Sequence, residues 1–121
     1  MSRLPAVYGP ASGRPFDPEH AGGPVRRLST NRVRITDRGI AVVERHLRRF
    51  GPDPDNAGMV GRLRAVAAGR LAPTAYDRNF YAHELREFVR FRRNGWPDGV
   101  PADRDESHAL WNNAHTAALE D

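Results

Sequence analysis

The chain has 121 residues, of which 39% are hydrophobic and 28% are charged, and this length suits a single domain. It contains no cysteine, which excludes a disulfide framework, a thiolate nucleophile and a cysteine-ligated zinc. No run of about 18 apolar residues occurs, so we expect no membrane segment, and residues 1–5 lack the apolar stretch of a secretory signal. The net charge is +4, and all nineteen basic residues are Arg, whose planar fork suits phosphate or carboxylate partners.

Residues 1–28 read as a Gly/Pro-rich arm or linker, and residues 29–121 as a single helix-rich domain. The arm holds five of the ten prolines, and because proline removes backbone donors and glycine favours irregular backbone, we expect no regular structure there. Such an arm either wraps the domain or links it to a larger protein. Apolar and basic residues then alternate over residues 31–35, which predicts one short strand that pairs with part of the arm.

From residue 36 onward the apolar residues recur at helical spacing, and four helices are predicted over 36–50, 53–68, 74–94 and from 103 or 105 to residue 121. Thr36, Asp53 and Thr74 are good N-caps, and Asp77 lies three residues after Thr74, as in a capping box. Glycines close the first two of these helices. The predicted fold class is therefore mainly α, with α+β possible through one short strand or hairpin.

The third predicted helix carries the densest group of polar residues. His83 and Glu87 are four residues apart and share a face, next to large apolar residues where an unpaired imidazole would be costly. We therefore take His83 as a candidate catalytic residue and Glu87 as the carboxylate that orients it. The alternative is that Glu87 pairs with Arg90 while Glu84 is solvated. The stretch is not the His-Glu-x-x-His of zinc peptidases, because residue 87 is Glu.

The last predicted helix carries His108 and His115, two turns apart on one face, with Asn112 beside them. If this helix packs on the third, all three histidines can converge with Glu87. Two histidines can then act as base and acid in RNA cleavage, or the imidazoles and Glu87 can ligate a divalent metal; the spacing leaves both open. The alternative is that His115 is an interior histidine that ties two helices together.

Arginines at i, i+4 and i+7 line one side of the third helix, interleaved with aromatic residues, as in proteins that bind single-stranded RNA. The alternative is that the aromatic residues are core and the arginines a solvated face. The candidate substrate-binding residues are Arg86, Arg90, Arg93, Tyr81 and Asn112.

Three strings of the chain resemble carboxy-terminal toxin domains of bacterial polymorphic toxins, of the Rhs and contact-dependent-inhibition type. They are residues 16–24 (FDPEHAGGP), 79–87 (NFYAHELRE) and 111–115 (WNNAH). The resemblance implies a domain that belongs to a larger precursor, is secreted or delivered into the cytoplasm of a target cell, and is blocked by a cognate immunity protein. Many such domains are nucleases, often metal-independent RNases. Cytidine deamination is disfavoured, since its zinc-binding cysteines are absent.

The residues and the resemblance together predict a toxin domain that cleaves RNA by histidine acid–base catalysis, without a cofactor although a divalent metal is possible. Its candidate catalytic residues are His83, Glu87, His115 and His108. The expected partners are an RNA substrate and the immunity protein. Two alternatives stay open: a metal-dependent hydrolase with a His/Glu site, and a non-enzymatic module in which the same residues form a buried network for partner binding.

Overall fold

The computed structural model describes residues 7–121, and within them four α-helices account for most of the chain. They are α1 (Asp37–Arg48), α2 (Pro54–Ala67), α3 (Ala75–Arg93) and α4 (Arg104–Glu120). A two-stranded antiparallel sheet of β1 (Val7–Tyr8) and β2 (Pro15–Phe16) precedes them, followed by the 3₁₀ turn η1 (Pro18–His20). The prediction of a mainly α fold with four helices and a small β element is confirmed.

The helices begin where the capping residues direct. The Thr36 side chain accepts from Gly39 N at 3.1 Å, and Asp53 accepts from the first amides of α2, with Pro54 in the first turn. At the start of α3, Thr74 and Asp77 form a capping box, in which each side chain accepts from the other residue's amide. These local bonds fix where each helix starts, and hence which residues face the core.

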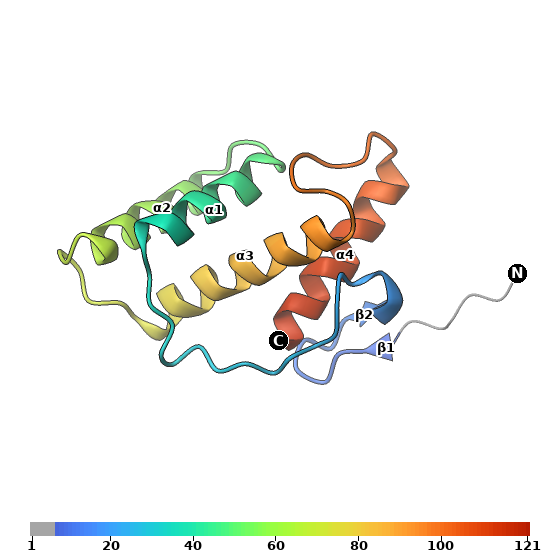
Figure 1. Cartoon of the computed structure of the whole chain (residues 1–121), viewed down its shortest axis with the longest axis horizontal. Coiled ribbons are helices and arrows are strands. Elements are labelled where there is room, and N and C mark those ends of the chain that lie inside the picture. The colour runs from blue at the N-terminus through green and yellow to red at the C-terminus, as the bar shows by residue number, and fades with distance from the viewer. Residues whose placement is uncertain (1–6) are drawn as a thin grey trace, which may run out of the picture.

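Helix α3 is the central element, because it contacts each of the other three helices. Figure 1 shows α1 and α2 side by side along one flank of α3, while α4 crosses it on the other. One apolar cluster fills the space between α1, α2 and α3; its buried members are Ile35, Ile40, Val43, Leu63 and Tyr81. The α1–α3 and α3–α4 contacts together position the polar residues described below.

The arm is more regular than its composition predicts, because it is anchored to the far end of the chain. The carboxylate of Glu120 on α4 accepts from the amides of Ala11 and Ser12, at 2.9 and 2.6 Å, in the turn between the two strands. Phe16 of β2 is buried with Ala21 and Ala117. Most of the described arm is irregular, as predicted; its regular parts are the short β1–β2 hairpin and η1, and it wraps the end of α4 (Figure 1).

The strand predicted over residues 31–35 is absent from the described chain; the segment is irregular there and leads into α1. The alternation of apolar and basic residues in this segment has another cause. Ile35 is buried and Val33 partly buried against the α1–α3 core, so the segment packs its apolar side chains on helices rather than pairing with another strand. Among the described residues, no helix is long and apolar enough to cross a membrane.

Candidate active site

Four ionisable side chains from three helices converge on the carboxylate of Glu87, and together with it they form a cluster of five residues. Helix α3 supplies Glu87 with His83 one turn before it, and Glu84 between them. Helix α1 supplies His46, and α4 supplies His115. These side chains come together because α3 packs against both α1 and α4.

The two oxygens of Glu87 serve different histidines. Oε2 lies 2.9 Å from His83 Nε2 and 2.9 Å from His115 Nδ1, and these two ring nitrogens are 3.1 Å apart. Oε1 lies 3.2 Å from His46 Nε2. The predicted convergence of His83, Glu87 and His115 therefore occurs, and the alternative pairing of Glu87 with Arg90 does not, because Arg90 pairs with Asp121.

Glu87 is ionised in this setting. Its side chain is 3% exposed, and burial alone would raise the pKa of its carboxyl. Hydrogen bonds from His115, His46 and His83 outweigh that effect and hold the pKa of Glu87 below its ordinary value. Since an ionised carboxylate only accepts, the nitrogen hydrogen-bonded to it, His115 Nδ1, carries the proton and donates.

His115 is thereby held in the tautomer of a general base. Its Nδ1 donates to Glu87 at 2.9 Å, which leaves the lone pair on Nε2. That nitrogen makes no hydrogen bond within residues 7–121, and the His115 side chain is 25% exposed. Trp111 stacks on the imidazole, with ring centroids 4.5 Å apart and planes within 16°. A carboxylate on Nδ1 and a free Nε2 is the arrangement that orients a histidine for proton abstraction.

His83 lies deeper than His115 and shares the same carboxylate oxygen. Its side chain is 16% exposed, against 25% for His115, and its Nδ1 is buried without a hydrogen-bond partner. Burial lowers the pKa of His83, but the hydrogen bond and charge of Glu87, with the charge of Glu84, outweigh it, so the net shift is upward. His83 therefore binds a proton more readily than an ordinary histidine, and it is not a second outward-facing base.

His46 was missed as a site residue, because its position on the apolar stripe of α1 indicated only burial. The imidazole is fully buried between the rings of Phe50, Phe88 and Phe91. Arg49 Nε donates to its Nδ1 at 3.0 Å, so the proton sits on Nε2, toward Glu87. Burial is the main cause that lowers the pKa of His46. A histidine at a core position was the one available signal, since such a ring needs a polar partner.

Glu84 is the second residue that sequence reasoning left out, having been assigned to solvent as the alternative. Its side chain is only 13% exposed, and one oxygen lies 3.7 Å from His46 Nε2. Burial, and then the negative charge of Glu87, raise the pKa of Glu84 to about 7. The site thus combines an ionised carboxylate with one that holds its proton near neutral pH.

The remaining predicted catalytic residue, His108, does not join the cluster. It is exposed on α4, and its ring centroid lies 6.1 Å from that of Trp111. His108 and His115 share one face of α4 but lie two turns apart along its axis, and only His115 is at the position where α3 crosses.

Three of the predicted substrate-binding residues are structural instead. Tyr81 is 3% exposed in the α1–α3 core. Arg90 is also 3% exposed and is held by arm carbonyls and Asp121. Asn112 donates to Pro15 O at 3.0 Å. The interpretation as a basic RNA-binding face was wrong for Arg90, because the arm covers that side of α3.

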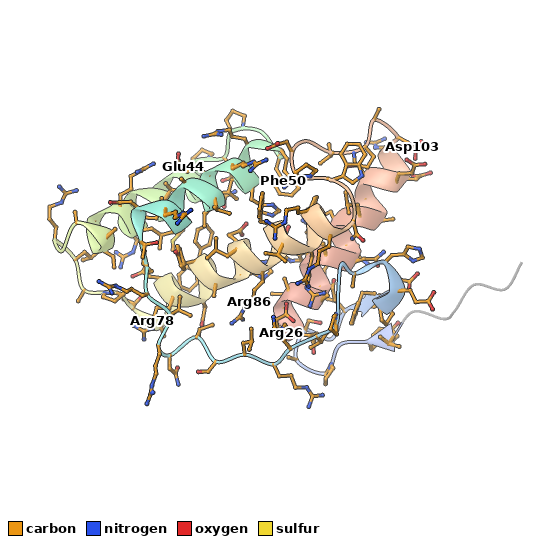
Figure 2. The ribbon with its side chains drawn as sticks, viewed as in Figure 1. Arg26, Glu44, Phe50, Arg78, Arg86 and Asp103 are labelled. Atoms are coloured by element: carbon orange, nitrogen blue, oxygen red, sulfur yellow. The ribbon has the colours of Figure 1, made fainter. Side chains whose placement is uncertain are left out.

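The other two arginines of that face stay accessible. Arg93 is exposed, and its side chain makes one hydrogen bond within residues 7–121, to Gly22 O at 3.5 Å. Arg86 is partly exposed, and Figure 2 shows its side chain on the side of α3 that faces away from α1. Phe88 and Phe91 are buried, so the alternative in which the aromatic residues are core is the one observed.

Two sets of side chains could hold a metal ion. One is His83, Glu87 and His115; the other is His46, Glu84 and Glu87. In the first set the ligand atoms are 2.9, 2.9 and 3.1 Å apart. Two ligands about 2.1 Å from a metal and at right angles to each other lie about 3 Å apart, so this triangle fits one face of an octahedron.

No protein-family model, curated protein or solved structure matches this chain.

Proposed function

We propose that this protein is an RNase that cleaves phosphodiester bonds by acid–base catalysis, with His115 as the base. The observation that carries the proposal is the bond from His115 Nδ1 to the ionised Glu87, at 2.9 Å, on a side chain that is 25% exposed and whose Nε2 makes no hydrogen bond within residues 7–121. An arginine-rich chain with a net charge of +4 is suited to an anionic substrate.

In the proposed reaction, His115 Nε2 removes the proton of a ribose 2′-hydroxyl, and the resulting oxygen attacks the adjacent phosphorus. The bond from phosphorus to the 5′-oxygen breaks, which leaves a 2′,3′-cyclic phosphate and a 5′-hydroxyl end. Glu87 stabilises the imidazolium that forms, as carboxylates do in such dyads. His83, whose pKa is raised, adds positive charge near the phosphate when it is protonated.

We assign the general acid to Glu84, which protonates the leaving 5′-oxygen. Its pKa of about 7 keeps a proton available at neutral pH. It lies near His46, on the Oε1 side of Glu87, whereas His115 is on the Oε2 side. Two carboxyl groups whose surroundings move their pKa values in opposite directions provide the complementary roles that such catalysis needs.

The test is incubation of the purified chain with total RNA in buffer that contains EDTA. We expect cleavage, and His115→Ala should lower the rate at least about 10²-fold because the base is gone. His20→Ala is the matched control, since the His20 side chain is exposed and, within the described residues, bonds only to Asp17; its rate should equal that of the unaltered chain. Intact RNA in every buffer, with and without divalent metals, would remove the proposal.

A metal-dependent hydrolase is the second candidate, and the triangle formed by His83, Glu87 and His115 specifically favours it. The two candidates differ in their response to chelation. If EDTA abolishes cleavage and Mn²⁺ or Zn²⁺ restores it, these three residues are metal ligands rather than a proton relay. Metal analysis of protein purified without chelator then gives the identity and stoichiometry of the ion.

We also propose the biological setting that the resemblance implies: a toxin domain of a larger precursor, delivered into the cytoplasm of a target cell and neutralised by an immunity protein. The three strings over residues 16–24, 79–87 and 111–115 support it. Expression of the chain alone should stop bacterial growth, and co-expression of the product of the neighbouring gene should restore it. Normal growth with confirmed expression of soluble, folded chain would contradict the toxin assignment.

A further inference from the structure

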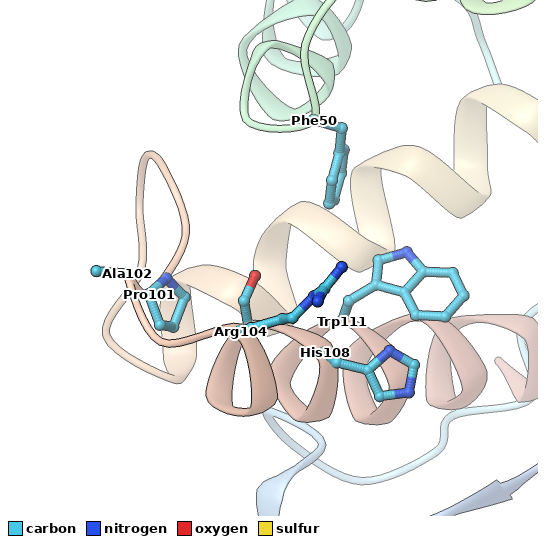
Figure 3. Close-up of a pocket in the computed structure, with 7 residues that line it drawn as sticks. Phe50, Pro101, Ala102, Arg104, His108 and Trp111 are labelled. Atoms are coloured by element: carbon cyan, nitrogen blue, oxygen red, sulfur yellow. The ribbon is translucent and has the colours of Figure 1, made fainter.

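An open pocket of about 540 Å³ lies between the end of α1 and the first turns of α4. Figure 3 shows the side chain of Phe50 directed toward Arg104 and Trp111, which come from α4. Ser107 and His108 complete its polar side. The pocket is distinct from the Glu87 cluster, since none of the five cluster residues lines it.

Both aromatic walls of the pocket are in contact with the cluster. Trp111 stacks on His115, with centroids 4.5 Å apart, and Phe50 meets His46 edge to face, with centroids 5.4 Å apart. A ligand in the pocket therefore sits one aromatic ring away from two of the imidazoles. A single strand that crosses the site next to His115 would place a neighbouring nucleotide here.

The pocket is lined by side chains of the kinds that contact a nucleotide, an exposed aromatic ring and a guanidinium. Phe50 is a large aromatic residue that is nevertheless 43% exposed, and an exposed ring is a surface on which a base can stack. Arg104 is exposed, and its guanidinium makes no hydrogen bond or ion pair within residues 7–121, so it is free to pair with a phosphate. His108 adds a further exposed ring at the rim.

We propose that this pocket binds one nucleotide of a single-stranded RNA substrate, its base against Phe50 and its phosphate on Arg104. The inference rests on the proposed RNase function and names its substrate subsite. In this proposal the phosphate contact comes from Arg104 rather than from the predicted arginine face of α3, in which Arg90 is buried. His108 then lies beside the substrate and has no catalytic role.

The experiment measures equilibrium binding of a short, fluorescein-labelled, 2′-O-methyl RNA of mixed sequence, which lacks the 2′-hydroxyl nucleophile and so reports binding without cleavage. Arg104→Gln and Phe50→Ala should each weaken binding about tenfold, the usual effect of losing one stacked base or one phosphate contact. Arg38→Gln and Leu119→Ala are the matched controls. Arg38 is an exposed arginine of α1, and Leu119 is 43% exposed, as Phe50 is, but lies outside the pocket. Both should bind as the unaltered chain does.

A second measurement keeps the inference testable if Phe50→Ala does not fold. In a Trp96→Phe background, Trp111 is the one tryptophan left, and the RNA should quench its fluorescence; an oligonucleotide that is abasic at every position should bind more weakly. No binding by the unaltered chain, or unchanged binding by both pocket variants, overturns the subsite. If RNA is cleaved while the pocket variants bind normally, only the subsite fails. If the pocket binds RNA but no RNA is ever cleaved, the RNase proposal fails and the subsite stands.

Discussion

Two glutamates three residues apart on α3 have opposite protonation behaviour, and the cause is what each one faces. Three imidazoles have a nitrogen within 3.2 Å of the Glu87 carboxylate, and they hold its pKa below the ordinary value although it is buried. Glu84 receives no such donors, so burial and the nearby charge of Glu87 raise its pKa to about 7. The pair shows that the protonation state of a carboxyl follows from its hydrogen-bond donors more than from its depth.

Because Glu84 has a raised pKa, folding should depend on pH between about 4.5, its ordinary value, and about 7. In that range the unfolded chain has lost the proton and the folded chain keeps it, so stability falls as the pH rises, by about 1.4 kcal/mol per pH unit and roughly 3 kcal/mol in total. Glu84→Gln cannot ionise and should be more stable than the unaltered chain at pH 8, with little difference at pH 4.5.

Chemical denaturation at pH 4.5, 6 and 8 measures this effect, with Glu106→Gln as the control because Glu106 is exposed at the start of α4. The same variant should lose RNA cleavage at least about 10²-fold if Glu84 is the acid. A Glu84→Gln protein whose stability has the same pH dependence as the unaltered chain would show that Glu84 titrates normally.

At the residue scale, three of the five cluster residues could be predicted from the sequence. His83 and Glu87 are four residues apart on one helix, and their shared face follows from helix geometry alone. His115 could be added on the assumption that the last helix packs against α3, since its imidazole then lies near His83 and Glu87. His46 and Glu84 could not be assigned to the cluster from the sequence. Their roles depend on which helix packs against α3 and at which position along it, and the local spacing of residues does not specify that packing.

The start of α3 combines a capping box with an ion pair between helices. Asp77 closes the box with Thr74 and also accepts two bonds from Arg62 of α2, at 2.8 and 2.9 Å. Its side chain is fully buried, whereas that of Arg62 is 42% exposed. The bonds from Arg62, with those from Thr74, outweigh burial and hold the pKa of Asp77 well below its ordinary value. One carboxylate thus starts a helix and joins it to its neighbour.

Asp77→Asn should lower the free energy of unfolding by about 1–2 kcal/mol at pH 7, through the weaker cap and the lost charge. A depressed pKa stabilises the folded state above the ordinary value of 3.8 and stops doing so as the pH falls below it. The deficit of the variant should therefore shrink below about pH 4. Urea titrations at pH 7 and pH 3 test this, and Asp55→Asn, an exposed first-turn position of α2, should show almost no deficit at either pH.

At the element scale, the sequence predicts the helices well and the strands poorly. Caps such as Thr36 and Asp53 act within three residues, so they can be read locally. The β1–β2 hairpin depends on Glu120, more than a hundred positions away in the chain, and the segment 31–35 is extended because of helices that follow it. Long-range partners of this kind leave no trace in local periodicity.

Arg90 joins the arm, α3 and the end of α4 into one unit. Its guanidinium donates to the carbonyls of Ala21, Gly23 and Pro24 and pairs with Asp121. Gly22 lies directly against the backbone of Arg90 with a φ of +75°, where a Cβ would not fit. The glycines of this segment are therefore required by the close approach of the arm to α3.

Arg90→Gln should cost about 3–5 kcal/mol, because it leaves a buried carboxylate and several carbonyls without their donor. Hydrogen exchange should rise chiefly in residues 9–27, since that segment loses its anchor. If the variant is too unstable to purify, Arg90→Lys, which keeps the charge but not the fork, should have an intermediate stability. Arg38→Gln, at an exposed position, is the control; equal protection of the arm in Arg90 variants would contradict this role.

Three helices depend on a single carboxylate, and this has an evolutionary consequence. Replacement of Glu87 would remove the carboxylate next to three imidazoles at once, while replacement of one imidazole would change the electrostatic environment of the other two. In divergent descendants of this gene, positions 46, 83, 87 and 115 should therefore be inherited or lost together, as a single heritable character, even while the surrounding apolar positions drift freely.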